Sequence, residues 1–287
     1  MLGSPKKAII FGLAALLAPS LVTAMDKDEP SPYDPQAAVK YSQAAVGNRL
    51  SHHQLINRSG KPITLDHFDG APLIVNMIYT ACADFCPTVV ENLRAAVDAG
   101  KEIIGDNRFN IVSVGFDPRG DTPARMRAFA TTHGIHEDNW YFLSADEETL
   151  KKLAAELGFI YFPSFNGFDH IAQTSVIDLE GRVFQQVYGV NFDPPAVIEP
   201  LKKLLSGRNA TPSNLSDVVE RIKLFCTFYD PAAGRYELDY SIVISLVIGS
   251  IILLILMFIV SRAGLHMMQE RRRRTNRKDD NGLQQHL

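Results

Sequence analysis

A pair of cysteines at the junction of a strand and a helix is the feature that most restricts the fold of this chain. The apolar run at residues 73–79 is typical of a buried strand, and residues 88–99 carry apolar side chains at helical spacing. Cys82 and Cys86 lie between the two, and Pro87 follows directly. Because the missing N–H of proline costs nothing in the first turn of a helix, the sequence predicts that a helix begins here.

The position of the two thiols predicts their chemistry. A residue before proline avoids the helical region, so Cys86 is expected to be the non-helical residue that opens the helix, with Cys82 in the preceding loop. Both sulfurs would then face the positive end of the helix dipole, which stabilises thiolate over thiol. Such a pair can act as a redox couple, form a disulfide or bind a soft metal. The alternative is that the two cysteines are unrelated buried thiols. Their position at the start of a helix would then be a coincidence.

Apolar segments near both ends predict an export signal and a membrane anchor. Residues 1–24 hold two lysines, a short apolar stretch and the small residues Val22, Thr23 and Ala24, and are interpreted as a secretory signal peptide. An uncleaved N-terminal anchor is the alternative, which the short apolar length disfavours. Residues 242–260 carry no charge and are long enough to cross a bilayer once.

The charge that follows the second apolar segment predicts its orientation. Residues 262–287 hold seven basic and three acidic side chains, and an excess of positive charge marks the cytoplasmic side. The globular part is therefore expected outside the cytoplasm. The expected divisions are a signal peptide (1–24), a flexible lead-in (25–44), a core domain (45–207), a membrane-proximal segment (208–240), a transmembrane helix (241–261) and a basic cytoplasmic tail (262–287).

The charge balance excludes one class of partner. The whole chain has a net charge of −3, but residues 25–261 hold 20 basic and 29 acidic side chains, a net charge of −9. Nucleic-acid binding needs a basic surface, so no nucleic-acid partner is expected. The three cysteines are too few for a disulfide-dense scaffold, and core packing must carry the stability.

Strand and helix signals alternate through the core domain. This alternation predicts an α/β sandwich, in which a central mixed sheet is covered by helices. The expected strands are residues 73–79, 109–116 and 141–143, with hairpins within 55–65 and 174–188; the expected helices start at the cysteines and cover 124–133, 147–157 and 195–205.

The sequence offers one candidate for a third metal ligand beside the cysteine pair. Two thiolates select soft ions, chiefly copper(I), with zinc as the borderline case. A structural zinc site would need a second pair of cysteines or histidines, and the sequence offers none at the usual spacing. His170 is the best candidate, because the strand that follows it is expected in the same sheet as the strand before the cysteines. A lone histidine is more often a hydrogen-bonded structural residue, so this alternative stays open.

Three ordered motifs resemble the signatures of the Sco/SenC family of copper proteins, over about residues 45–206. They are Tyr79-Thr80-x-Cys82-x-x-x-Cys86-Pro87, Asp117-Pro118-x-x-Asp121-Thr122-Pro123, and Asp169-His170 ahead of Val176-Ile177-Asp178. The resemblance implies a thioredoxin-like fold and a copper ion, Cu(I) or Cu(II), held by Cys82, Cys86 and His170. It also implies a role in delivering copper to the CuA site of cytochrome c oxidase. The family commonly has proline after the first cysteine, where this chain has Ala83.

The resemblance also implies partners and a location. A bacterial subgroup carries its anchor at the C-terminus, which would place the domain in the periplasm, on a single pass through the inner membrane. The expected partners are the copper-bearing oxidase subunit, a periplasmic thioredoxin-like reductant and another copper chaperone. Cys226, the odd cysteine, could relay electrons, accept copper or form an intermolecular bridge, but a small semi-apolar residue packed near the membrane is the favoured interpretation.

Two further activities use the same thiols. A thiol-disulfide reductase that keeps the CuA-site cysteines reduced would need Cys82 and Cys86 as attacking and resolving thiols, without His170. Peroxidase chemistry is disfavoured, because the peroxiredoxin-type pattern places threonine three residues before the reactive cysteine and Thr80 is two before Cys82.

Overall fold

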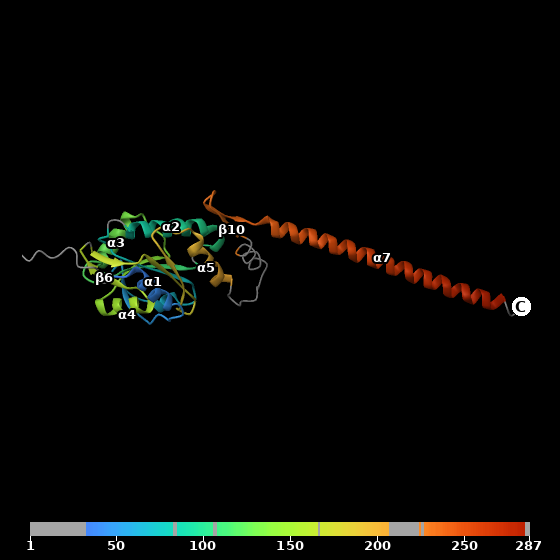
Figure 1. Ribbon diagram of the computed structural model, residues 1–287, viewed down its shortest axis with the longest axis horizontal. Helices are drawn as coiled ribbons and strands as arrows, with labels where there is room; N and C mark the ends of the chain where they lie inside the picture. The colour runs from blue at the N-terminus through green and yellow to red at the C-terminus, as the bar shows by residue number, and fades with distance from the viewer. Residues whose placement is uncertain are drawn as a thin grey trace, which may run out of the picture. The chain divides into compact units, whose positions relative to one another are not determined.

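The computed structural model describes residues 33–82, 85–105, 108–165, 167–206, 224 and 227–284. The expected signal peptide and Cys226 lie outside these residues. Figure 1 shows the elements, which are α1 (Pro35–Ala44), β1 (Gln54–Asn57), β2 (Pro62–Thr64), η1 (Leu65–Phe68), β3 (Leu73–Ile78), α2 (Phe85–Ile104), β4 (Asn110–Gly115), α3 (Pro123–Thr132), β5 (Trp140–Ser144), α4 (Glu147–Leu157), β6 (Tyr161–Ser164), β7 (Gly167–His170), β8 (Gln173–Ile177), β9 (Val183–Tyr188), α5 (Pro195–Ser206), β10 (Thr227–Asp230), β11 (Arg235–Leu238) and α7 (Tyr240–Gln284).

A seven-stranded mixed sheet forms the centre of the domain. Its strand order is β2-β1-β5-β4-β3-β8-β9. The central strands β3, β4 and β5 run parallel, whereas β8, β9, β1 and β2 join antiparallel at the two sides. The predicted α/β sandwich with a central mixed sheet is confirmed, and so are both predicted hairpins, β1–β2 and β8–β9.

Strand β3 is buried on both faces, which explains why its sequence is an almost unbroken apolar run. Successive side chains point to opposite faces. Ile74 and Ile78 join the hydrophobic cluster under α2, α3 and α5, while Val75 and Met77 join the cluster under α4 and η1. In Figure 1, α2, α3 and α5 lie on one side of the sheet and α1 and α4 on the other. The strand that leads to the cysteines is therefore held by two hydrophobic layers.

The helix boundaries follow local chemistry. The side chain of Thr122 caps α3 by accepting the N–H of Arg125 at 3.3 Å, as the threonine before a proline predicts. Helix α4 spans the predicted residues and ends at Gly158, which adopts φ +67°. A Cβ at Gly158 would lie 2.7 Å from the Cβ of Ala45, so glycine is required there by both conformation and packing.

Two segments differ from the sequence-based expectation. Pro35–Ala44, expected within the flexible lead-in, forms α1, because Asp34 caps the helix and Pro35 occupies its first turn. Helix α1 buries only small residues, which leaves no apolar stripe to detect. The hairpin β6–β7, which carries His170, was not predicted either; its strands are four residues long and one contains Pro163.

The β10–β11 hairpin of the membrane-proximal segment docks on the domain through a buried lysine. Lys202 of α5 is only 7% exposed. Its ammonium donates to the carbonyl oxygen of Thr227 at 2.9 Å, pairs with Glu199 at 2.9 Å and lies 5.2 Å from the ring centre of Tyr236. The Tyr236 ring is itself part of the cluster under α2, α3 and α5. The hairpin is thus a component of the core.

Helix α7 contains a candidate membrane span. Residues Ile244–Gly264 are long and apolar enough to cross a bilayer, by length and composition, and their side chains are not buried within the molecule. This agrees with the apolar segment predicted at 241–261. In the structure the helix continues beyond it into the basic segment, as far as Gln284.

Replacing Lys202 by methionine is expected to loosen the hairpin. The change removes the donor to the Thr227 carbonyl and leaves Glu199 without its partner, a loss of about 1–3 kcal/mol. Hydrogen exchange of the full-length protein in detergent should then accelerate in β10 and β11 by about tenfold or more. Lys203→Met is the control, because Lys203 is the exposed neighbour in the same helix. Equal protection in both variants would contradict the docking role of Lys202.

Candidate functional site

The two cysteines lie together at the carboxyl end of β3, with different exposure. Neither forms a disulfide; Cys82 is partly exposed in the loop, and Cys86 is 3% exposed in the first turn of α2. The backbone N–H of Tyr79 donates to the sulfur of Cys86 at 3.4 Å. Cys86 is helical rather than the non-helical residue predicted, because α2 begins at Phe85; Pro87 still lies in the first turn, where no N–H needs a helical partner.

The environment of Cys86 favours its protonated form. Burial raises the pKa of the Cys86 thiol to about 12, and the neighbouring Cys82 thiol and Asp121 act in the same direction, against the N–H of Tyr79. The prediction that the helix dipole holds Cys86 as a thiolate is therefore wrong. Packing under α2 removes this sulfur from water, and the cost of burying a charge exceeds the stabilisation by the dipole.

A buried carboxylate ties the cysteine loop to the β4–α3 loop. Asp121 is 3% exposed and accepts hydrogen bonds from the N–H of Thr80 at 2.8 Å, from its hydroxyl at 2.6 Å and from the N–H of Asp117 at 2.8 Å. Burial raises the pKa of Asp121, and these hydrogen bonds oppose the rise. Asp117 instead accepts the N–H of Arg119 within its own turn. Both aspartates belong to the second sequence motif, but the contact of Asp121 with the cysteine loop is a tertiary one that the motif does not reveal.

The imidazole of His170 is oriented by the backbone carbonyl of the next residue, Ile171. Its Nδ1 lies 2.8 Å from the carbonyl oxygen of Ile171, so Nδ1 carries the proton and Nε2 keeps the lone pair in the neutral ring. Burial lowers the pKa of His170, which keeps the ring neutral at neutral pH. The ring packs against Phe116 and Phe159, with centroids 5.1 and 5.5 Å apart. Its protonation state suits a metal ligand.

The structure brings the two sulfurs together but leaves His170 in a separate environment. Among the described residues, no three histidine, cysteine or acidic side chains lie close enough to share a metal ion. Tyr79 lies between the two environments: its backbone contacts Cys86, while its ring packs 6.0 Å from Phe116 and 5.1 Å from Phe168. The assignment of His170 as a ligand stays a prediction.

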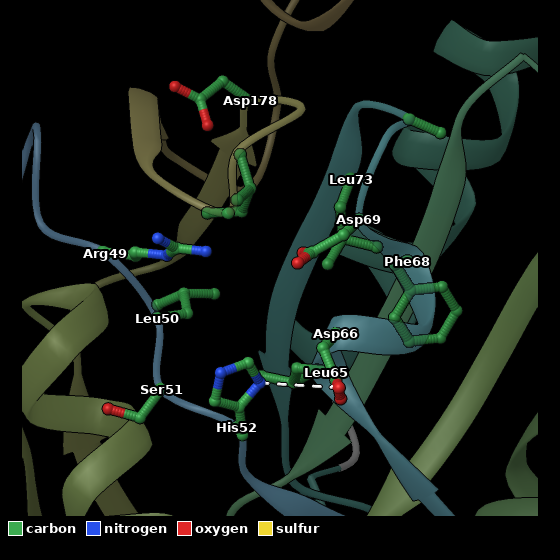
Figure 2. Close-up of a pocket in the computed structure, with 13 residues that line it drawn as sticks. Arg49, Leu50, Ser51, His52, Leu65, Asp66, Phe68, Asp69, Leu73 and Asp178 are labelled. Carbon is green, nitrogen blue, oxygen red and sulfur yellow. Dashed lines mark ion pairs between the residues drawn. The ribbon is translucent and has the colours of Figure 1, made fainter.

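The pocket in Figure 2 contains none of the predicted site residues. It adjoins Leu73, at the end of β3 opposite to the cysteines, and an ion pair joins His52 Nδ1 to Asp66 Oδ2 at 3.5 Å. Its volume of about 20 Å³ is that of about one water molecule. This pocket does not admit a substrate.

The unequal exposure of the thiols predicts unequal reactivity. In the reduced full-length protein at neutral pH, iodoacetamide should alkylate Cys82 at least about tenfold faster than Cys86, because Cys86 is buried and protonated. Peptide mapping by mass spectrometry measures both rates, and the urea-unfolded protein is the control, in which the two rates should converge. Faster alkylation of Cys86 in the folded protein would contradict the geometry.

Comparisons with known proteins agree on one family. The family model described as SCO1/SenC matches residues 42–206, more than half of the chain. A SCO1 protein homolog of Bacillus subtilis (strain 168) is 24% identical over 143 residues, which cover 48% of this chain and 72% of the relative. A candidate copper-binding protein of Stutzerimonas stutzeri is 23% identical over 113 residues, 39% of this chain and 52% of the relative.

A solved structure shares the fold. BsSco, described as a member of the Sco family of cytochrome c oxidase assembly proteins with a disulfide switch, matches with a TM-score of 0.50 and 21% identity, covering 55% of this chain and 94% of that chain. The likeness confirms the predicted thioredoxin-like sandwich. Because the family model covers most of the folded domain, including both cysteines and His170, the chain belongs to the SCO1/SenC family.

Proposed function

We propose that this protein is a membrane-tethered copper chaperone that delivers copper to the CuA site of cytochrome c oxidase. The observation that carries the proposal is the pair of reduced cysteines, Cys82 and Cys86, lying against each other in a SCO1/SenC domain. Two similar proteins support the proposed role. One is described as a candidate copper-binding protein, and BsSco belongs to a family of oxidase assembly proteins.

The donor set fits copper as cargo. Two thiolates bind soft ions, and copper(I) is the softest of the common ones. Binding must displace the thiol protons, including that of Cys86, so the ion itself supplies the electrostatic stabilisation that the protein interior lacks. The lone pair of His170 Nε2 is the third donor. It reaches the ion when the cysteine loop or β7 moves so that the imidazole and the two sulfurs, now separated by Tyr79, come together. A three-ligand site stays open to a receiving protein.

The candidate span in α7 provides the tether. The basic residues that follow it favour a cytoplasmic C-terminus, which leaves the domain in the periplasm. A domain held at the membrane meets the copper-bearing subunit of an oxidase at high effective concentration. A disulfide between the two cysteines cannot bind the ion, so a thioredoxin-like reductant is required, and another copper chaperone supplies the copper.

A thiol-disulfide reductase for the oxidase cysteines is the second candidate. It is favoured by the asymmetry between an accessible Cys82 and a buried, protonated Cys86, which suits an attacking and a resolving thiol. This activity needs no third ligand, so the separation of His170 from the sulfurs does not count against it.

Metal analysis tests the proposed function. The full-length protein, purified reduced from copper-supplemented cells, should hold about one equivalent of copper, and Cys82→Ser and Cys86→Ser should each hold almost none, because one thiolate alone grips the ion weakly. Copper-free wild-type protein that still reduces a CuA-site peptide, and whose Cys86→Ser variant accumulates a mixed disulfide with it, would overturn the chaperone role in favour of the reductase.

Substitution of His170 tests the third ligand. His170→Ala should weaken copper retention against a competing chelator by about tenfold or more, since even outer partners of metal ligands contribute that much. His133→Ala is the matched control, because His133 is an imidazole that borders the cleft beside Cys82. Dithiol oxidation should stay near the wild-type rate in both variants. Weaker retention in His133→Ala alone would reassign the ligand.

A further inference from the structure

A cleft beside Cys82 offers the approach to the exposed thiol. It has a volume of about 310 Å³ and lies between the start of α2 and one side of α3, where Cys82, Arg125, Phe129 and His133 border it. Cys86 is buried behind Cys82 and does not border the cleft. A sulfur or a metal ligand of a partner that comes through this cleft therefore meets Cys82 first.

Arg125 supplies a charge that the domain itself does not use. Its guanidinium has no ion pair or hydrogen bond among the described residues, whereas its backbone N–H donates to the Thr122 hydroxyl. It occupies the first turn of α3, where the helix dipole disfavours a cation. A residue that is unfavourable in its local context and has no internal partner indicates a role outside the domain.

The other charges around the cleft are engaged within the domain. His133 Nδ1 lies 3.4 Å from a carboxylate oxygen of Glu91, and the Arg94 guanidinium donates to the carbonyl oxygens of His133 and Gly134 at 3.0 and 3.3 Å. Asp121, behind the loop, is occupied by its three hydrogen bonds. Among the described residues, Arg125 is therefore the cleft's unpaired charge, and it is positive.

We propose that this cleft is the docking site for an acidic, thiol- or disulfide-bearing segment of the partner protein, and that Arg125 determines its charge preference. The inference rests on the proposed function, since both copper transfer and thiol exchange pass through Cys82. The Phe129 ring and the aliphatic part of the cleft contact the segment's backbone, and Arg125 pairs with its carboxylate. A charge at the rim of an interface acts mainly on the rate of association.

Small disulfides probe the cleft without a known partner. The Cys82 thiolate attacks one sulfur of the probe, the probe's S–S bond breaks, one half leaves as a thiolate, and a mixed disulfide remains on Cys82. In the full-length Cys86→Ser protein this adduct accumulates, and mass spectrometry locates it. The anionic probe is dithiobis(nitrobenzoate) and the cationic probe is cystamine. The measured quantity is the ratio of their rates at Cys82, each divided by the rate with the urea-unfolded protein.

Removing the positive charge should change that ratio. Arg125→Met is expected to lower the anionic-to-cationic ratio by about two- to fivefold, the effect of one exposed charge at short range, and high salt should reduce the difference. Arg125→Lys keeps the charge and should restore the ratio. Arg127→Met is the matched control on the same helix, because the Arg127 side chain is already engaged, its Nε donating to the carbonyl oxygen of Arg58 at 2.8 Å.

The outcomes separate this inference from the proposed function. A ratio that stays unchanged in Arg125→Met, or that falls equally in Arg127→Met, overturns the docking role, whatever the copper content of the wild-type protein. A lowered ratio that Arg125→Lys restores supports it, including in a protein that binds no copper and acts as a reductase. Copper content is measured on the protein with both cysteines intact and bears on the proposed function alone.

Discussion

The burial of β3 on both faces is the constraint on which the site depends. Because the strand is held between two hydrophobic layers, its carboxyl end is fixed, and the chain must turn into α2 directly after it. Asp121 adds a second restraint by binding Thr80 through backbone and hydroxyl. Cys82 and Cys86 are thereby positioned by rigid neighbours, which limits the entropy lost when both sulfurs engage a single ion or each other.

The two sides of the sheet give the site two different environments. On one side, Cys86 is enclosed by the helices α2, α3 and α5; on the other, His170 packs on an aromatic cluster that includes Phe116 and Phe159. Tyr79 contributes to both clusters. The proposed three-ligand site would therefore need a conformation in which these aromatic contacts are rearranged, whereas the proposed dithiol chemistry would not.

Local signals made much of the fold predictable, whereas long-range packing set the site's electrostatics. The buried strand and the bounds of α4 were predictable from nearby residues, and the structure confirms them; the Thr122 cap of α3 is local in the same way. The pKa of Cys86 could not be foreseen, because its burial depends on helices distant in sequence. For the same reason the sequence did not reveal that Asp121, rather than its motif neighbour, reaches the cysteine loop, or that a short hairpin carries His170.

The docked β10–β11 hairpin determines the length of chain between the sheet domain and α7. With β11 ending at Leu238 and α7 beginning at Tyr240, Asp239 is the one residue between the hairpin and the helix that holds the candidate span. Were the hairpin detached, residues 207–239 could extend to roughly 110 Å. With α7 as the proposed membrane anchor, the Lys202 contacts shorten the connection from the sheet domain to the anchor from more than thirty residues to one.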